Sequence, residues 1–382
     1  MSYQKIVISG VVALTTSVFT LSAYAAPSII SYKEASSAYS DAYVTGNFNA
    51  ADGNQQRASY DMNLGLDFEK VLSTPSRNIK YDFTASGSKK RSSTNGEAAT
   101  NTYQTFGSAT MDKYFRAGSK GAFWYGKGEV GAKKGQQKAF SKVTAGLGYG
   151  RVVNVTPMAR AIRVVAALRN NGSLTAEPSN DKYQEIATII AKEAEYRSKH
   201  GVRYYQQYWV ADIEKVLGGT IGARGAIRAN DVLGNERIST RKHGWLVRAG
   251  IGAVLSDYDG ETGKPAVEVG AEYHRPIGNQ TQFSNEAILT TTLKDSNKSY
   301  IVKNNMSLTH EISDVIDWEN KWTVDYSKSD NVDAITNHTL SSAFNYQLGN
   351  QLAYNITATL VKTDAKDDLD QKLSMGIKYR LK

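Results

Sequence analysis

Apolar and polar residues alternate along most of the chain, in segments of about ten residues that are separated by clusters of Gly, Asn, Asp and Ser. The clearest segment covers residues 60–69, where Tyr60, Met62 and Leu64 begin an apolar series that alternates with polar and acidic residues. A helix would mix these two sets of side chains, whereas a strand places them on opposite faces. The alternation therefore predicts strands with one face suited to lipid and the other to water.

Fourteen segments fit this pattern, six before and eight after a stretch that does not. Bacterial single-chain barrels have an even number of strands, and they must close because lipid offers no hydrogen-bond partner to a free strand edge. We therefore predict an all-β, transmembrane antiparallel β-barrel of about 14 strands, with twelve and sixteen strands as alternatives. The predicted strands are 41–49, 60–69, 78–88, 100–114, 122–133, 139–152, 244–257, 265–275, 281–294, 299–312, 315–328, 335–348, 351–363 and 370–382.

The last predicted strand has a distinctive pattern, because residues 372–382 alternate without a break. The pattern resembles the C-terminal signal by which Gram-negative outer-membrane β-barrels are recognised for insertion. The sequence departs from that signal in continuing to Lys382 where such proteins commonly stop on an aromatic. The resemblance implies two partners, the barrel assembly machinery and outer-membrane lipid. The residues that carry it are Ser374, Gly376, Tyr379 and Leu381.

The first residues of the chain predict export. Lys5 precedes an apolar run over 6–21, and Ala23-Tyr24-Ala25 follows as a small-residue cleavage pattern. The alternative is a retained anchor helix, which is less favoured because polar residues interrupt a run that is already short for spanning a bilayer. We therefore predict a signal peptide over residues 1–25 that is removed on the way to the bacterial outer membrane.

One long stretch, residues 153–243, lacks the alternation and predicts helices. Thr156-Pro157 is a typical helix start, and Gly172 ends the first predicted helix. A second is predicted from Ser179 to Gly201, and a third over 203–217. The predicted organisation is a signal peptide (1–25), a first barrel half (26–152), a helical insertion (153–243) and a second barrel half (244–382).

The insertion follows an even-numbered strand, so it should lie at the end of the barrel that holds both termini, which is the periplasmic end. Two interpretations stay open. The insertion is a plug, a gate or a docking module for a periplasmic partner, or it is a small cap that only seals and stabilises the barrel. Long structured insertions are usually functional, but the mixed charges of this one indicate no ligand.

Composition excludes several classes of protein. The sequence has no Cys, which removes disulfides, thiol catalysis and Cys-bound metals. Its net charge of +9 comes from Lys and Arg scattered along the alternating segments, so we expect no nucleic acid as a partner. The five His show no metal-ligand spacing and no Ser-His motif. We therefore expect no metal, no cofactor and no enzymatic activity, while a clustered Ser, His and acid would favour a lipid-modifying enzyme at the rim.

The polar faces of the strands predict the lining of the barrel, in which positive and negative charges are nearly balanced. In a wide pore such charges create a transverse field that orients polar solutes. In a narrow barrel they pair across the interior and fill it. Gly146, Gly148 and Gly150 are expected to be small lumen residues that let a neighbouring side chain approach the wall. The candidate lumen charges are Asp61, Asp67, Lys80, Asp82, Lys127, Glu129, Lys142, Arg248, Glu268, Glu272, Lys303, Asp317, Glu319, Lys321 and Asp325.

The C-terminal part of the chain resembles a known family. The turn Asp257-Tyr258-Asp259-Gly260, the strand over 267–274 and the ending Tyr379-x-Leu381 are similar to the uncharacterised salt-stress-induced outer-membrane protein family. The resemblance runs from Trp245 to Lys382. It implies an outer-membrane barrel of undefined biochemical role, and the helical insertion departs from it.

From these features we expect an outer-membrane pore or gated channel for small polar solutes. The alternative is a structural or docking protein with a closed barrel whose helices bind a periplasmic partner. Whether residues 153–243 occlude the lumen would discriminate between the two.

Overall fold

The computed structural model describes residues 26–34, 36–219, 221–236, 238–294, 297–330, 332–349, 351–364 and 368–381. The predicted signal peptide (1–25) and Lys382 lie outside these residues. Fourteen strands form one closed antiparallel barrel in which each strand pairs with its neighbours in sequence, and β1 pairs with β14. The predicted fold class is therefore confirmed. The strands are β1 (Ser37–Ala51), β2 (Ser59–Thr74), β3 (Arg77–Arg91), β4 (Thr100–Tyr114), β5 (Ala122–Lys133), β6 (Phe140–Asn154), β7 (Lys242–Ser256), β8 (Lys264–Ile277), β9 (Thr281–Lys294), β10 (Asn297–Ser313), β11 (Ile316–Ser329), β12 (Val332–Gln347), β13 (Leu352–Thr363) and β14 (Asp370–Leu381).

The alternation in the sequence becomes an apolar outer face and a polar inner face. Leu64, Leu147, Ile251 and Leu373 lie on four different strands and are 54–75% exposed, as lipid-facing residues of an isolated barrel would be. Their sequence neighbours point inward, because successive side chains of a strand alternate between its two faces. Such a barrel leaves no free edge for lipid to satisfy. Several strands are longer than predicted, β1 and β2 most clearly.

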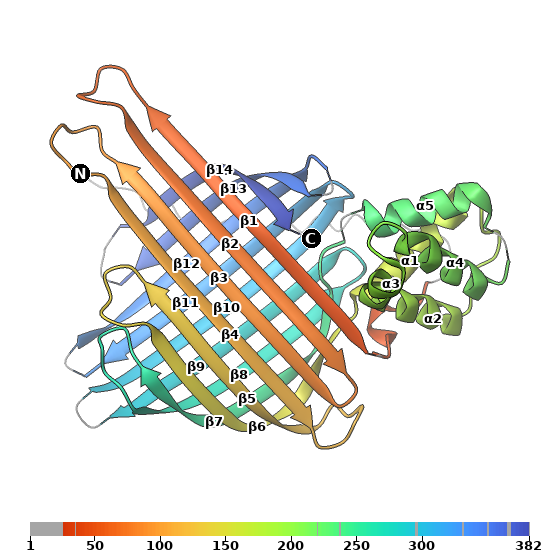
Figure 1. Ribbon diagram of the computed structural model, residues 1–382, viewed down its shortest axis with the longest axis horizontal. Coiled ribbons are helices and arrows are strands. Elements are labelled where there is room, and N and C mark those ends of the chain that lie inside the picture. Colours follow the sequence, from red (N-terminus) through yellow and green to blue (C-terminus); the bar gives the residue numbers. More distant parts are fainter. Residues whose placement is uncertain are drawn as a thin grey trace, which may run out of the picture.

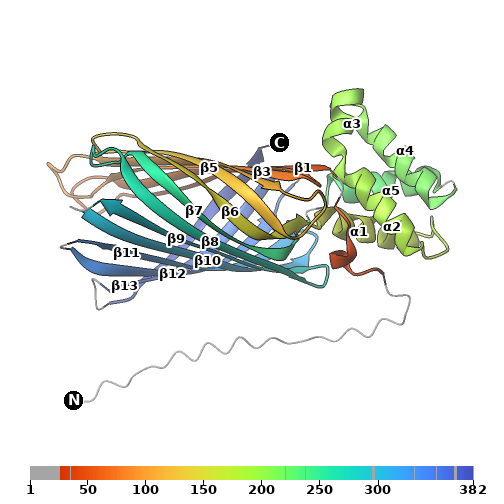
Figure 2. The ribbon, with the colours of Figure 1, turned by 90° about the horizontal axis from the view of Figure 1, so that it is seen from below.

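Five α-helices lie between β6 and β7, beyond one end of the barrel (Figures 1 and 2). Together they form what we call the helical module, at the same end as the start of β1 and the end of β14. None of the helices among the described residues is long and apolar enough to cross a membrane. The helices are α1 (Thr156–Asn170), α2 (Asn180–Ala191), α3 (Glu193–His200), α4 (Tyr205–Leu217) and α5 (Gly222–Gly234).

The helical module differs from the prediction in two respects. The single helix expected between Ser179 and Gly201 is broken at Lys192, whose backbone leaves the helical region (φ −92°, ψ 16°), so that α2 and α3 are separate. Helix α5 was not predicted at all, because Gly222 and Gly225 weaken its helical signal. The starts of α1 and α2 follow ordinary rules: Pro157 occupies the first turn of α1, and the Ser179 hydroxyl accepts a hydrogen bond from the Lys182 amide.

The main hydrophobic core of the described residues lies in the helical module and not in the barrel. Trp209, Ile186, Val165 and Leu168 are at most 1% exposed, and Ile29, in the short 3-10 helix before β1 (η1, Ile29–Ser31), packs against the same cluster. A buried aliphatic side chain contributes about 1.5–3 kcal/mol to folding. The module therefore has the core of a small soluble domain, whereas the barrel turns its apolar side chains outward.

Candidate functional site at the mouth of the barrel

A cavity of about 520 Å³ separates the helical module from the interior of the barrel. Strand residues line one side of it, among them Glu69 and His274, and module residues such as Arg160, Glu193 and Tyr205 line the other. The module therefore lies over the mouth and does not enter the lumen as a plug.

A buried carboxylate on β10, Glu311, connects the module to the rim of the barrel. Its Oε2 lies 2.5 Å from Arg163 Nη2 of α1, and its Oε1 lies 2.7 Å from Arg241 Nη2. The Ser239 amide and hydroxyl both donate to Oε1, at 2.7 and 2.9 Å. Burial lowers the pKa of Arg241, and the attraction of Glu311 opposes this shift. Because buried charges need partners of this kind, the cluster, which we call the Glu311 clamp, holds the module against the barrel.

A second connection joins the segment before β1 to both parts. The Gln184 side chain of α2 exchanges two hydrogen bonds with the backbone of Lys33, at 2.9 and 2.8 Å. Glu34 forms an ion pair of 3.1 Å with Arg151 of β6. Burial raises the pKa of the Glu34 carboxyl, and its hydrogen bond with Ser73 and the Arg151 charge act in the opposite direction. The module is thus attached to the mouth at two places.

Several predicted lumen charges meet on β5, β6 and β8. Lys142 Nζ lies 2.8 Å from Glu129 Oε2 and 2.5 Å from Glu268 Oε2, and Lys127 Nζ lies 3.0 and 3.2 Å from the same two carboxyl groups. The side chains of Lys142 and Glu268 are 4% and 1% exposed. These four charges pair with one another, both between neighbouring strands and between strands further apart. Mutual pairing of the lumen charges was one of the two interpretations of the sequence.

The inner face of β4–β8 is densely packed, and we call it the packed wall. Phe123 and Tyr125 of β5 are buried, and they lie over glycines of the neighbouring strands. A Cβ on Gly148 would come within 2.2 Å of the Phe123 ring, and one on Gly146 within 2.7 Å of the Tyr125 ring. Glycines 146 and 148 thus have the steric role predicted for them.

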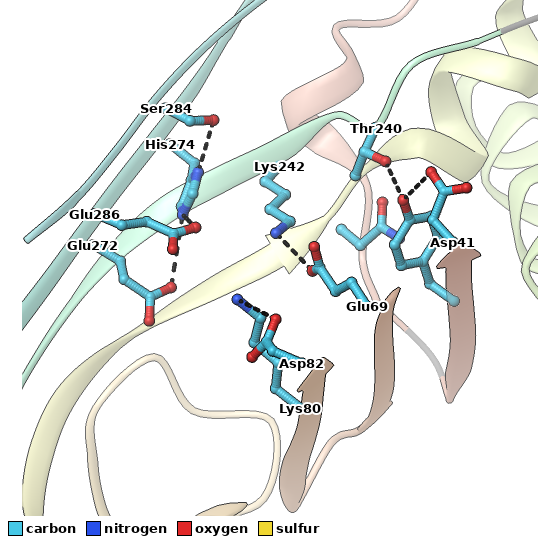
Figure 3. A network of polar contacts seen from close by, with 12 residues as sticks. Asp41, Glu69, Lys80, Asp82, Thr240, Lys242, Glu272, His274, Ser284 and Glu286 are labelled. Atoms are coloured by element: carbon cyan, nitrogen blue, oxygen red, sulfur yellow. Dashed lines mark hydrogen bonds and ion pairs between the residues drawn. The ribbon is translucent and has the colours of Figure 1, made fainter. Parts of the chain in front are cut away.

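Further ion pairs run between strands near the cavity (Figure 3). Lys242 of β7 lies 3.0 Å from Glu69 of β2, and Lys80 lies 3.3 Å from Asp82 on β3. Arg248 Nη2 lies 3.1 Å from Glu272 Oε1 and also 3.3 Å from Asp112 of β4. Arg248, Glu272, Lys80 and Asp82 were among the predicted lumen charges.

The other predicted lumen charges lie on the inner faces of β2, β10 and β11, and the charge of Asp317 also acts on Arg241 of the Glu311 clamp. Asp61 Oδ1 accepts a 2.8 Å hydrogen bond from the Asn63 amide group. The strand register places Lys303 opposite Asp325, and Thr309 opposite Glu319. In the same register Lys321 lies opposite Ser307 and Asp317 opposite Glu311, while Asp67 lies opposite Thr84 of β3.

Sequence reasoning missed several residues at the mouth. Glu311, Arg163 and Arg241 were not singled out, because alternation identifies the face of a strand but not which helix covers it. Lys242 was missed because β7 was predicted to begin two residues later. Glu286 could have been found, since it continues the inward series of Gln282 and Ser284 on β9.

The four residues of the predicted C-terminal signal lie on the strand that closes the barrel. Gly376 approaches β1 closely, since a Cβ there would lie 3.0 Å from the Gly46 carbonyl oxygen. Ser374 Oγ donates to the Thr357 carbonyl at 3.4 Å. Tyr379 and Leu381 point outward and are 40% and 39% exposed.

A closed antiparallel barrel with an apolar outer face and a polar, charged interior is the fold of an outer-membrane β-barrel protein. Residues 233–381 match the profile of a family described as "Protein of unknown function, DUF481". The match covers the part of the chain for which the sequence predicted a family resemblance. A search of curated proteins finds no match.

Solved structures of outer-membrane barrels are similar to the chain at low identity. CdiB from Escherichia coli is 9% identical over 89% of this chain and 62% of its own, with a TM-score of 0.40, so the chain spans less than two thirds of that protein. An anion-selective porin from Comamonas acidovorans is 8% identical over 91% of this chain and 100% of its own, with a TM-score of 0.34. The Acinetobacter baumannii protein Omp33 is 9% identical over 91% of this chain and 99% of its own, with a TM-score of 0.29.

Proposed function

We propose that the chain is a gated outer-membrane channel for small polar solutes and that the helical module is its gate. The observation that carries the proposal is the cavity of about 520 Å³ beneath a module that covers one mouth of the barrel. In this proposal the chain is not an enzyme. Residues 1–25 would be removed during export, the assembly machinery would read the C-terminal signal, and the covered mouth would face the periplasm.

The interior supports a path for solutes along one side. On β12, β13, β14 and β1, away from the Arg380–Asp41 ion pair and Lys378, inward positions carry half-buried hydroxyl and amide side chains. We call this surface the polar wall. Neutral donors and acceptors bind a polar solute weakly enough to release it again, as conduction requires. The residues of the polar wall are Thr45, Asn47, Thr339, Ser341, Asn355, Thr357 and Ser374.

The connections of the module suit a gate. Most of its hydrophobic core comes from its own helices, with Ile29, Tyr32 and Val153 added from outside them, so a movement of the module as one body would keep most of this core together. The Glu311 clamp and the Lys33–Gln184 pair would hold the closed state. A periplasmic protein that bound the module more tightly in the released position would open the channel, because a ligand shifts an equilibrium only by its preference for one state.

Planar-bilayer recordings of single channels test this proposal. The full chain is compared with a deletion of residues 157–240, which can be joined directly because the Val155 amide donates to the Arg241 carbonyl at 2.8 Å. Glu311→Gln removes the charge of the clamp, and Glu319→Gln on β11 is the matched control. We expect brief, rare openings of the intact chain, steady conductance after the deletion, and more frequent openings with Glu311→Gln alone.

Folding of every variant is verified by heat-modifiable mobility on gels. Silence of the folded deletion variant would contradict the channel and favour the docking protein with a closed barrel. Equal steady conductance of the intact chain and the deletion variant would contradict the gate and leave an open pore.

A hydrolase is the second candidate function, and one observation favours it. Ser284 Oγ lies 2.9 Å from His274 Nδ1, and the far side of the ring faces two carboxylates. In such an enzyme Ser284 Oγ would attack an ester carbonyl while His274 takes its proton and returns it to the departing alcohol. Water, deprotonated by His274, would then cleave the acyl-serine into a carboxylic acid and free Ser284. Hydrolysis of a short-chain ester by the purified chain, lost in Ser284→Ala, would establish this activity. Equal rates in both proteins would exclude it.

A further inference from the structure

Two glutamates lie directly opposite each other on the inner face of the barrel. Glu272 of β8 pairs in register with Glu286 of β9, and the next inward pair along these strands is His274 with Ser284. Like charges opposite each other on neighbouring strands destabilise a sheet unless a cation lies between them. One ligand atom from each of Glu272, His274 and Glu286 lies within 4.8 Å of the others.

His274 points into the space between these carboxylates. Its side chain is 1% exposed, and its Nε2 has no hydrogen-bond partner among the residues that the structure describes. This nitrogen lies 3.6 Å from Glu272 Oε2 and 3.8 Å from Glu286 Oε1, too far for a hydrogen bond. Ligand atoms around a tetrahedral zinc ion are about 3.4 Å apart, given bond lengths of about 2.0–2.2 Å. The two separations from His274 Nε2 are therefore close to those between ligands of one ion, and longer than a direct hydrogen bond.

The surroundings supply the outer contacts that metal ligands need. Ser284 Oγ lies 2.9 Å from the other ring nitrogen of His274, where it fixes the orientation of the ring. Arg248 Nη2 lies 3.1 Å from Glu272 Oε1, so that the second oxygen, Oε2, remains turned toward His274 (Figure 3 shows His274, Ser284 and both glutamates). Two of the three ligands, His274 and Glu272, are thus oriented by a neighbour, as is usual for metal-binding His and carboxylate groups.

The charges near the site leave an excess of two carboxylates. Lys242 pairs with Glu69, Lys80 lies beside Asp82 and is also attracted by Glu286, and Arg248 is shared between Asp112 and Glu272. The carboxylates of these clusters and of Glu286 therefore outnumber their cations by two. A single divalent cation would balance them.

We propose that Glu272, His274 and Glu286 bind a divalent transition metal ion of the zinc class at the inner wall of the barrel. An imidazole with two carboxylates suits zinc and its neighbours, whereas calcium and magnesium prefer oxygen ligands alone. His274 and Glu286 line the cavity beneath the helical module, which gives the ion its route of entry. The inference does not depend on the channel proposal. It assigns an ion-binding site to the mouth whatever passes through the barrel.

Zinc titration of the full chain tests this site. The protein is purified in detergent, stripped with a chelator and titrated with Zn²⁺ by calorimetry, and Co²⁺ is added separately to record the absorption bands of a bound ion. We expect one ion per chain. His274→Gln and Glu286→Gln should each weaken zinc binding at least tenfold, and Ser284→Ala by about 10–100-fold through the lost support of the ring.

His310→Gln is the matched control, because His310 is on the neighbouring strand β10 and its Nδ1 lies 2.8 Å from Thr281 Oγ1, away from the site. It should bind zinc like the unaltered chain. Heat-modifiable gel mobility shows which variants are folded. One folded variant of the two, His274→Gln or Glu286→Gln, is enough for the test. Failure of the unaltered chain to bind zinc, or equal binding by folded His274→Gln and Glu286→Gln, would overturn the proposal and leave His274 as a structural neighbour of the two carboxylates.

Discussion

The two sides of the barrel interior use polar residues in opposite ways. On the packed wall, charged side chains are buried and paired with one another, and aromatic rings lie flat over glycines. On the polar wall, uncharged hydroxyl and amide groups face the interior and stay half-buried. The charges that look most functional in the sequence therefore stabilise one wall by pairing with one another, and the neutral residues that look least informative form the other wall.

The difference follows from the cost of burying charge. A charge removed from water needs a close partner, and a network that satisfies every member becomes rigid. Lys142 has such partners in Glu129 and Glu268, so that wall cannot rearrange for a solute. A wall of Thr, Ser and Asn stays hydrated without partners of this strength. We infer that the packed wall sets the shape of the interior and the polar wall provides its passage.

The largest expected effect is on the stability of the packed wall. Glu268→Gln keeps the shape of the side chain but removes the charge that Lys142 and Lys127 share. Removing the charge of one partner in a buried ion pair costs about 3–5 kcal/mol of stability, because the other charge stays buried without compensation. Urea unfolding of the barrel in detergent should show a loss of this size. Ser341→Ala on the polar wall is the control and should change stability by less than about 0.5 kcal/mol; equal losses would remove the distinction between the walls.

An intermediate loss of unfolding free energy is expected from a substitution beneath the aromatic rings of the packed wall. Gly148→Ala places a Cβ within 2.2 Å of the Phe123 ring and 2.8 Å of the Val247 carbonyl oxygen, so one of these groups must move. Overpacking of this kind costs about 1–3 kcal/mol. Gly126→Ala on the neighbouring strand meets nothing within 4 Å and should leave the unfolding free energy nearly unchanged. The comparison is made by the same urea unfolding, and a stable Gly148→Ala variant would show that the rings are not fixed against the wall.

The smallest expected effect is on ion selectivity, measured as the reversal potential across a salt gradient in the channel opened by deletion of residues 157–240. Thr357→Lys adds one positive charge to the polar wall. At about 8 Å in water this charge attracts a passing anion by about 0.5 kcal/mol and repels a cation by the same amount, which together change the anion-to-cation permeability ratio about fivefold. Thr357→Ala is the control. Lys127→Gln, which alters a paired charge of the packed wall, should shift the ratio less, and the opposite order would mean that ions pass along the packed wall.

The barrel could be predicted from sequence because its signal is local. Each strand shows its own period-two pattern, and the loops between strands are rich in the residues that end strands. Strand number and closure followed from the requirement that no edge face lipid, and the pairing of β1 with β14 confirms both. The ends of β1 and β2 were misjudged because the alternation of apolar and polar residues weakens where strands leave the apolar zone.

The sites at the mouth could be predicted only in part. Alternation placed Glu268 and Lys127 on the inner face, but it could not show that they meet, since 141 positions separate them in the sequence. Their contact depends on the register of every strand between them, which no local pattern specifies. The Glu311 clamp is even harder to predict from sequence, because it joins a strand to a helix whose position depends on the packing of the whole module.

The pairing between β1 and β14 differs in one respect from the others. Among the described residues it extends only over Ala42–Gly46 and Ile377–Leu381, the stretch that also contains Tyr379 and Leu381 of the C-terminal signal. The backbone N–H and C=O groups along one edge of a strand can form hydrogen bonds with only one neighbouring strand at a time. Any assembly factor that pairs a strand of its own with this edge must therefore dissociate before β1 and β14 can pair and close the barrel. Two residues of the predicted C-terminal signal lie in the same short stretch that closes the barrel, so closure would hide that part of the signal from such a factor.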